Sequence, residues 1–195
     1  MGELIGLLLF GFVGSVSPGP NNTLLWASGM RFGLRETVPH VVGTALGIGL
    51  LVVGVAAGIG ALLEAAPVAE VGLKVVGSAY LLYVAYLVVG SGGVGRAETS
   101  RPLNVRQAIV FQCVNPKAWV FALAAVGTFL SDDLPIALAV LVLTTILMVA
   151  VAGSSWLWAA GGSALGRVVD DQRTMRVISI VLAVLLLVSV ALIWI

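Results

Sequence analysis

Six apolar segments, each long enough to cross a membrane, fill most of this 195-residue chain. They cover residues 4–30, 40–63, 68–90, 107–130, 135–160 and 174–195. A helix needs about 20 apolar residues to span the hydrocarbon core of a bilayer. Only 10% of the residues are charged, against about 25% in a typical soluble domain. The sequence therefore predicts an all-α integral membrane protein with six transmembrane helices, forming a single transmembrane domain over residues 1–195.

Arginines mark alternate connections between these segments, whereas Lys74 and Lys117 lie within the third and fourth segments. The first, third and fifth connections hold all eight arginines, namely Arg31, Arg35, Arg96, Arg101, Arg106, Arg167, Arg173 and Arg176. Loops rich in Lys and Arg stay on the cytoplasmic side. The pattern predicts a multi-pass protein of the cell (inner or plasma) membrane, with both termini outside.

Two of the apolar segments are interrupted near their middle. The first interruption is Ser17-Pro18-Gly19-Pro20-Asn21-Asn22, and the second is Asn115-Pro116-Lys117. Proline cannot continue a helix, and backbone groups freed at membrane depth need protein or water as partners. Paired breaks in two halves are typical of transporter binding sites. We therefore predict a 3+3 inverted repeat, with halves 1–95 and 96–195 and with broken helices one and four.

Each break is expected to start a new half-helix. Ser17 is the predicted N-cap of one, with Pro18 at its first position, and Asn115 and Pro116 repeat the arrangement. A helix N-terminus offers free N–H groups and partial positive charge, which suit a carboxylate or another anion. The alternative is a pair of simple kinks that neighbouring helices relieve.

Lys117 strengthens the case for a polar site. It lies too deep in its segment to reach an interface, and a central lysine costs about 3 kcal/mol on insertion scales. Asp and Glu are absent from the interior of all six segments, so we expect a substrate carboxylate to pair with it. Alternatively, Lys117 is uncharged or bonds the carbonyl groups freed by the break. The amides of Asn21, Asn22 and Asn115 either hold a substrate amino group or tie down loose backbone.

Weaker signals lie in the second and third segments. Tyr80 and Tyr83 share a helix face and either line a cavity or pack in the core. Gly43 and Gly47 have the spacing that lets helices approach closely. His40 stands at the predicted start of a span, so we interpret it as an interfacial residue rather than a proton carrier.

Several chemistries find no support in the sequence. A single cysteine excludes a cysteine cluster for metal, and there is no Gly-rich Lys-Ser/Thr phosphate loop. No acid–base pair lies inside the spans. We therefore expect no enzyme activity, no cofactor, no metal site and no nucleic-acid partner.

Three motifs resemble the LysE/RhtB family of amino-acid exporters. They are Ser17-Pro18-Gly19-Pro20-Asn21, the stretch from Leu73 to Tyr83 (LKVVGSAYLLY), and Asn115-Pro116-Lys117-Ala118. Gly127-Thr128-Phe129-Leu130 departs from the Pro-Gln-Phe of many members. With Asn21-Asn22 and Trp119, it resembles the branch near the cysteine and O-acetylserine exporters.

The resemblance implies a secondary exporter that moves an amino acid or derivative out of the cytoplasm against an inward proton gradient. The functional positions it implies are Pro18, Pro20, Asn21, Asn115, Pro116 and Lys117. Together with the breaks, it predicts export of a neutral amino acid by alternating access, with amino acid and lipid as partners and a homodimer left open. The alternatives are an anion or metal-ion transporter on the same architecture, and a membrane enzyme or scaffold.

Overall fold

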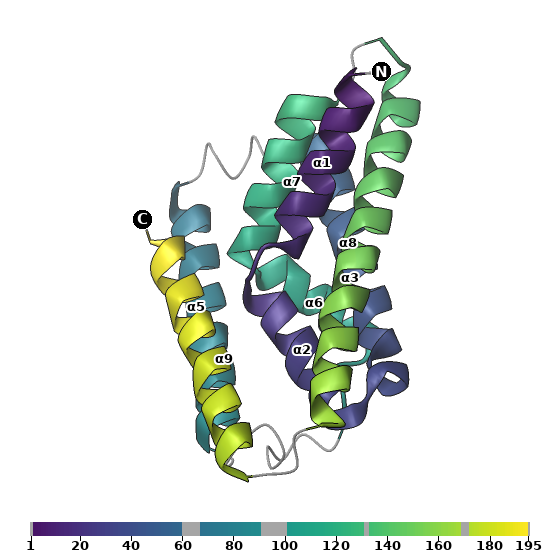
Figure 1. The fold of residues 1–195 in the computed structure, drawn as a ribbon. Coiled ribbons are helices and arrows are strands. Elements are labelled where there is room, and N and C mark those ends of the chain that lie inside the picture. The colour runs from purple at the N-terminus through teal and green to yellow at the C-terminus, as the bar shows by residue number, and fades with distance from the viewer. Residues whose placement is uncertain (1, 60–66, 91–100, 131–132, 169–171, 195) are drawn as a thin grey trace.

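The computed structural model describes residues 2–59, 67–90, 101–130, 133–168 and 172–194. Every regular element in these ranges is a helix (Figure 1). The elements are α1 (Gly2–Val16), α2 (Pro20–Phe32), α3 (Leu34–Gly54), the π-helical turn η1 (Val55–Ile59), α5 (Pro67–Gly90), α6 (Val105–Val114), α7 (Pro116–Phe129), α8 (Ile136–Gly166) and α9 (Gln172–Ile193).

Both predicted breaks are present. α1 and α2 meet at 62°, and α6 and α7 meet at 74°. Within the described residues, the stretches Leu34–Gly58 and Ile136–Gly166 are long and apolar enough to cross a membrane, and each bent pair adds one span if it crosses as a unit. The described residues therefore form an all-helical fold with two to four candidate membrane spans. The count of six spans stays a prediction.

The second span begins earlier than the apolar pattern suggests. α2 and α3 are joined by Gly33 alone, whose φ of 84° favours glycine. α3 therefore starts at Leu34, and Pro39 lies inside it. His40 is consequently inside a helix and only 1% exposed. The interpretation of His40 as an interfacial residue is wrong, because the turn at Gly33 moves the helix start six residues upstream.

The helices form one bundle with a flanking pair. α8 packs against α1, α2 and α3, α3 also packs against α6, and α5 lies beside α9 at one side (Figure 1). Glycines permit the closest approaches. A Cβ on Gly43 would lie 2.5 Å from the Val105 oxygen, and one on Gly47 would lie 2.7 Å from Gln112 Cβ, both on α6. This confirms the close packing predicted for Gly43 and Gly47.

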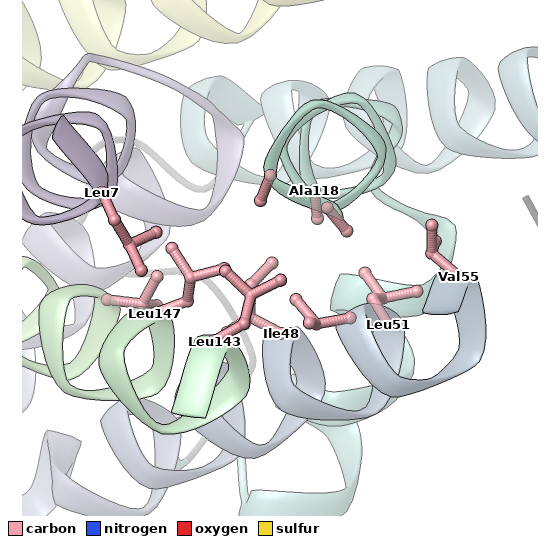
Figure 2. Close-up of a cluster of buried hydrophobic side chains, with 11 residues drawn as sticks. Leu7, Ile48, Leu51, Val55, Ala118, Leu143 and Leu147 are labelled. Atoms are coloured by element: carbon pink, nitrogen blue, oxygen red, sulfur yellow. The ribbon is translucent and has the colours of Figure 1, made fainter. Parts of the chain in front are cut away.

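The main hydrophobic cluster joins α1, α3, η1, α7 and α8 (Figure 2). Its labelled members include Leu7, Ile48, Leu51, Ala118 and Leu147. Many large apolar side chains, by contrast, lie exposed on the outside of the bundle, as a lipid-facing surface requires.

Candidate functional site

The first break frees carbonyl groups at the end of α1, and buried side chains satisfy them. Asn22 Nδ2 donates to the oxygens of Ser15 and Ser17 at 2.6 and 3.0 Å. From α8, Ser154 Oγ donates to the Ser15 oxygen, and Trp158 Nε1 donates to the neighbouring carbonyl of α1. Asn22 therefore ties down loose backbone, one of the two roles considered for the amides.

Lys117 crosses from the second break to the first. Its Nζ donates to the oxygens of Ser17 and Pro18 at 2.9 and 3.1 Å, and to Ser17 Oγ at 2.7 Å. These contacts use all three protons of the ammonium group. The lysine thus bonds carbonyls freed by a break, as one alternative held, but the break belongs to the other half of the chain. A Cβ on Gly19 would lie 2.9 Å from Lys117 Cδ, so the glycine leaves room for this crossing.

At the second break, Asn115 is the N-cap of α7. Asn115 Oδ1 accepts from the Lys117 backbone N–H, and Pro116 occupies the first turn of α7. Asn115 Nδ2 donates to Gln112 Oε1 at 3.2 Å. Trp119 Nε1 donates to the Cys113 oxygen at 2.7 Å. The predicted N-cap and proline of this half-helix are confirmed.

The start of α2 differs from the prediction. Gly19 is the N-cap and Pro20 follows it, whereas Ser17 Oγ bonds the Gly14 carbonyl instead of capping the helix. The choice of Ser17 as N-cap is wrong, because the extended backbone at Gly19 delays the helix by two residues. Gly19 has no side chain to accept a bond, so no side chain caps α2. The backbone N–H groups of Asn21 and Asn22 have no acceptor among the described residues.

A buried polar cluster lies behind α2. Asn21 Oδ1 is 3.1 Å from Thr44 Oγ1 and 3.3 Å from His40 Nε2, and both partners are on α3. Asn21 is 7% exposed, and Thr44 and His40 are 1% exposed. These contacts hold one end of the Asn21 amide against α3.

One cavity connects the two breaks. Its volume is about 50 Å³, and on this measure one water needs about 10–15 Å³. It therefore has room for a few waters or the polar head of a small molecule. Its lining combines polar groups and aliphatic or aromatic walls: Gly14, Ser15, Gly19, Pro20, Asn21, Asn22, Thr44, Ile48, Gln112, Asn115, Lys117, Ala118, Phe121, Val151 and Ser155.

Most of the predicted site residues meet at this cavity. Gly19, Pro20, Asn21, Asn22, Asn115 and Lys117 line it. Ser17 and Pro18 contact the Lys117 ammonium group from outside the lining. Pro116 is close to Gly77 of α5 instead, where a glycine Cβ would lie 2.8 Å from its ring.

Tyr83, one of the two predicted tyrosines, does not join the site. Tyr83 is 57% exposed on α5 and does not line the cavity. A position three residues away on a helix predicts a shared face but does not say which way that face points. The side chain of Tyr80 lies outside the described residues.

Sequence reasoning missed four polar residues that line the cavity: Ser15, Thr44, Gln112 and Ser155. Each lies inside an apolar segment, and all but the half-buried Ser15 are buried. Gln112 also lies one helical turn before Asn115. A polar side chain deep inside an apolar segment is the sequence signal that could have identified these residues. Among the described residues, no three His, Cys, Asp or Glu side chains gather as a metal site would require.

Comparisons with known proteins agree with this architecture. A membrane protein of Vibrio cholerae whose function is uncharacterized is 28% identical over 65% of this chain and 64% of its own length. The cysteine/O-acetylserine efflux protein of Escherichia coli K12 is 27% identical over 88% of this chain and 87% of its own length. Its counterpart in Escherichia coli O139:H28 is 27% identical over 89% and 88%. No solved structure matches the chain.

The family comparison covers nearly the whole chain, since residues 12–194 match the family described as LysE type translocator. The match includes both breaks and every residue that lines the cavity. It confirms the resemblance, and with it the expectation of a transporter rather than an enzyme. The chain belongs to the LysE family of translocators.

Proposed function

We propose that this protein is a six-span, secondary-active exporter of a neutral amino acid or a close derivative. The observation that carries the proposal is the cavity at which the two helix breaks and the Lys117 ammonium group meet. Two relatives are named for efflux of cysteine and O-acetylserine. These compounds are therefore the first substrates to test.

The chemistry of the cavity suits a carboxylate. Lys117 brings a positive charge, and the uncapped N-terminus of α2 adds the backbone N–H groups of Asn21 and Asn22. The residues that line the cavity include no Asp or Glu. A substrate carboxylate is therefore attracted, whereas a cationic side chain such as that of lysine finds no counter-charge.

Lys117 also links substrate binding to movement of the two halves. Its three acceptors belong to Ser17 and Pro18 in the first half, whereas Lys117 belongs to the second. A carboxylate that takes the ammonium group would replace these contacts and release one half from the other. Such an exchange of partners gives the ligand different affinities for two states, as alternating access requires.

The packing of the helices supports the inverted repeat. If the halves are related, α1 corresponds to α6, α2 to α7, and α3 to α8. Under this exchange, the contact of α3 with α6 becomes that of α8 with α1, and the contact of α3 with α7 becomes that of α8 with α2. All four contacts occur. Both halves lie in one chain, so the proposed mechanism needs no second copy.

The proposed orientation places both termini outside the cell membrane. The α2–α3 turn and the start of α9 carry arginines, and they lie at the end of the bundle opposite the two termini (Figure 1). Arg96 lies outside the described residues. Positive charge at one end supports a cytoplasmic location for that end. We propose proton exchange as the energy source, because the resemblance implies it.

Counterflow in proteoliposomes tests this function. Vesicles loaded with unlabelled cysteine, O-acetylserine, leucine, threonine or lysine would be diluted into labelled O-acetylserine. Neutral amino acids inside the vesicle should stimulate uptake, whereas lysine and amino-acid amides should not. An imposed pH gradient should drive accumulation that a protonophore abolishes.

Three outcomes would each contradict a part of the proposal. Equal stimulation by amino acids and their amides would rule out carboxylate recognition. No exchange with any amino acid, in protein with an intact melting transition, would rule out the substrate class and favour an inorganic or another organic anion. Accumulation that is insensitive to the pH gradient would contradict proton coupling alone.

A further inference from the structure

His40 is a buried polar residue that the proposed mechanism does not use. It lies on α3, is 1% exposed, and has its Nε2 3.3 Å from Asn21 Oδ1. Its other ring nitrogen, Nδ1, is buried and has no hydrogen-bond partner among the described residues. A polar ring in this position needs an explanation beyond packing.

The missing partner identifies the form of the ring. A neutral histidine carries one N–H and one bare nitrogen. A buried N–H without an acceptor is rarer in proteins than a buried acceptor without a donor. The proton therefore belongs on Nε2, which donates to Asn21 Oδ1, and the bare nitrogen is Nδ1.

This assignment also orients the amide of Asn21. With Oδ1 facing His40, Asn21 Nδ2 points away from α3. Nδ2 has no acceptor among the described residues, and Asn21 lines the cavity. Thr44 Oγ1 also lies 3.1 Å from Asn21 Oδ1, but its one proton has a competing acceptor in the His40 carbonyl at 2.9 Å. The His40 Nε2–H, by contrast, has Asn21 Oδ1 as its one acceptor among the described residues.

We propose that His40 is a positioning residue for substrate recognition. It holds the Asn21 amide so that Nδ2 donates into the cavity, beside the open N–H groups of α2. The ligand of that donor is the carboxylate of the amino-acid substrate, so the inference rests on the proposed function. His40 itself does not touch the substrate.

Two substitutions test whether His40 orients the Asn21 amide or only fills space. In His40→Gln, the amide nitrogen reaches about the place of Nε2 and keeps a donor toward Asn21. In His40→Asn, the side chain is shorter and its amide lies near the place of Nδ1, where no partner is available. Counterflow of labelled O-acetylserine should give a KM within about twofold of wild type for the glutamine variant. The asparagine variant should raise KM about tenfold, the effect of one lost hydrogen bond to a charged group.

A double-mutant cycle shows whether the effect passes through Asn21. In an Asn21→Ala background, His40→Asn should cause no further rise in KM, because the amide that it orients is gone. A purely structural histidine would instead lower the melting temperature and raise KM in both backgrounds. Equal KM values for the glutamine and asparagine variants, or additive effects in the cycle, would overturn the inference.

One measurement needs no variant. The chain contains a single histidine, so nitrogen NMR of ¹⁵N-histidine-labelled protein in lipid reports one ring. An Nε2–H tautomer is expected, and an Nδ1–H tautomer would overturn the inference even if the His40 variants do not fold. Wild-type protein that exchanges no amino acid would instead overturn the proposed function, so the two failures are distinguishable.

Discussion

Replacing Lys117 with methionine should strongly weaken recognition of the substrate while leaving the fold intact. The side chain keeps about its length but loses the ammonium group. Of the three acceptors, the Ser17 carbonyl still receives Asn22 Nδ2, and Ser17 Oγ still donates to the Gly14 carbonyl. Only the Pro18 oxygen loses the sole donor that the structure gives it. The folding cost is therefore about one hydrogen bond to a charged group.

The magnitudes of the two opposing effects are similar. One such bond contributes about 1.5–3 kcal/mol, and removing a lysine from the membrane interior recovers about 2.5–3.5 kcal/mol. The net change should be within about 1 kcal/mol, which is about 2–4 °C in melting temperature for a chain of this size. Loss of the contact to the substrate carboxylate should lower exchange about 10- to 100-fold.

The assay is counterflow of O-acetylserine beside a melting curve in detergent. Lys74→Met is the matched control, because Lys74 is the only other lysine and does not line the cavity. It should exchange at about the wild-type rate. Full exchange by Lys117→Met would refute the role of the ammonium group in binding. A fall in melting temperature of more than about 10 °C would instead show that Lys117 mainly holds the fold.

Two further predictions concern glycines. Gly19→Ala should reduce exchange strongly, because the new Cβ would lie 2.9 Å from Lys117 Cδ and 3.0 Å from its Nζ. Gly127→Ala, where a Cβ meets nothing within 4 Å, should leave counterflow unchanged. Gly162→Ala should lower the melting temperature by overpacking worth about 1–3 kcal/mol, since its Cβ would overlap the Trp26 backbone across the α2–α8 contact. Gly153→Ala, on the same helix with open space around it, should be neutral or slightly stabilising in the same melting assay.

The features predicted correctly share a local cause. Proline removes a backbone donor and clashes with the preceding turn, so the breaks near Pro18 and Pro116 follow from the chain itself, although Pro39 is accommodated inside α3. The pairing of Gly43 with Gly47 likewise follows from a spacing along one helix. Lys117 stood out because burying a charge in the membrane is costly regardless of what surrounds it.

The misplaced features depend on packing between segments. Gly19 rather than Ser17 caps α2, and the Ser17 hydroxyl instead accepts a hydrogen bond from Lys117 of the second half. The apolar pattern places a helix end near His40, but the turn at Gly33 starts α3 at Leu34, six residues upstream. Tyr83 faces outward because α5 pairs with α9 on the flank of the bundle. These contacts join different segments, so they cannot be predicted from the residue pattern of one segment alone.

The two sides of the first break are satisfied unequally, and this decides which ligand suits the cavity. On the α1 side, every carbonyl from Gly14 to Pro18 has a donor in the protein. On the α2 side, Gly19 provides no side-chain cap, and the N–H groups of Asn21 and Asn22 have no acceptor among the described residues. At the second break, Asn115 caps α7 from within. The donors left over therefore belong to α2, next to a lysine, and a ligand that supplies acceptors and negative charge fits there better than a cation.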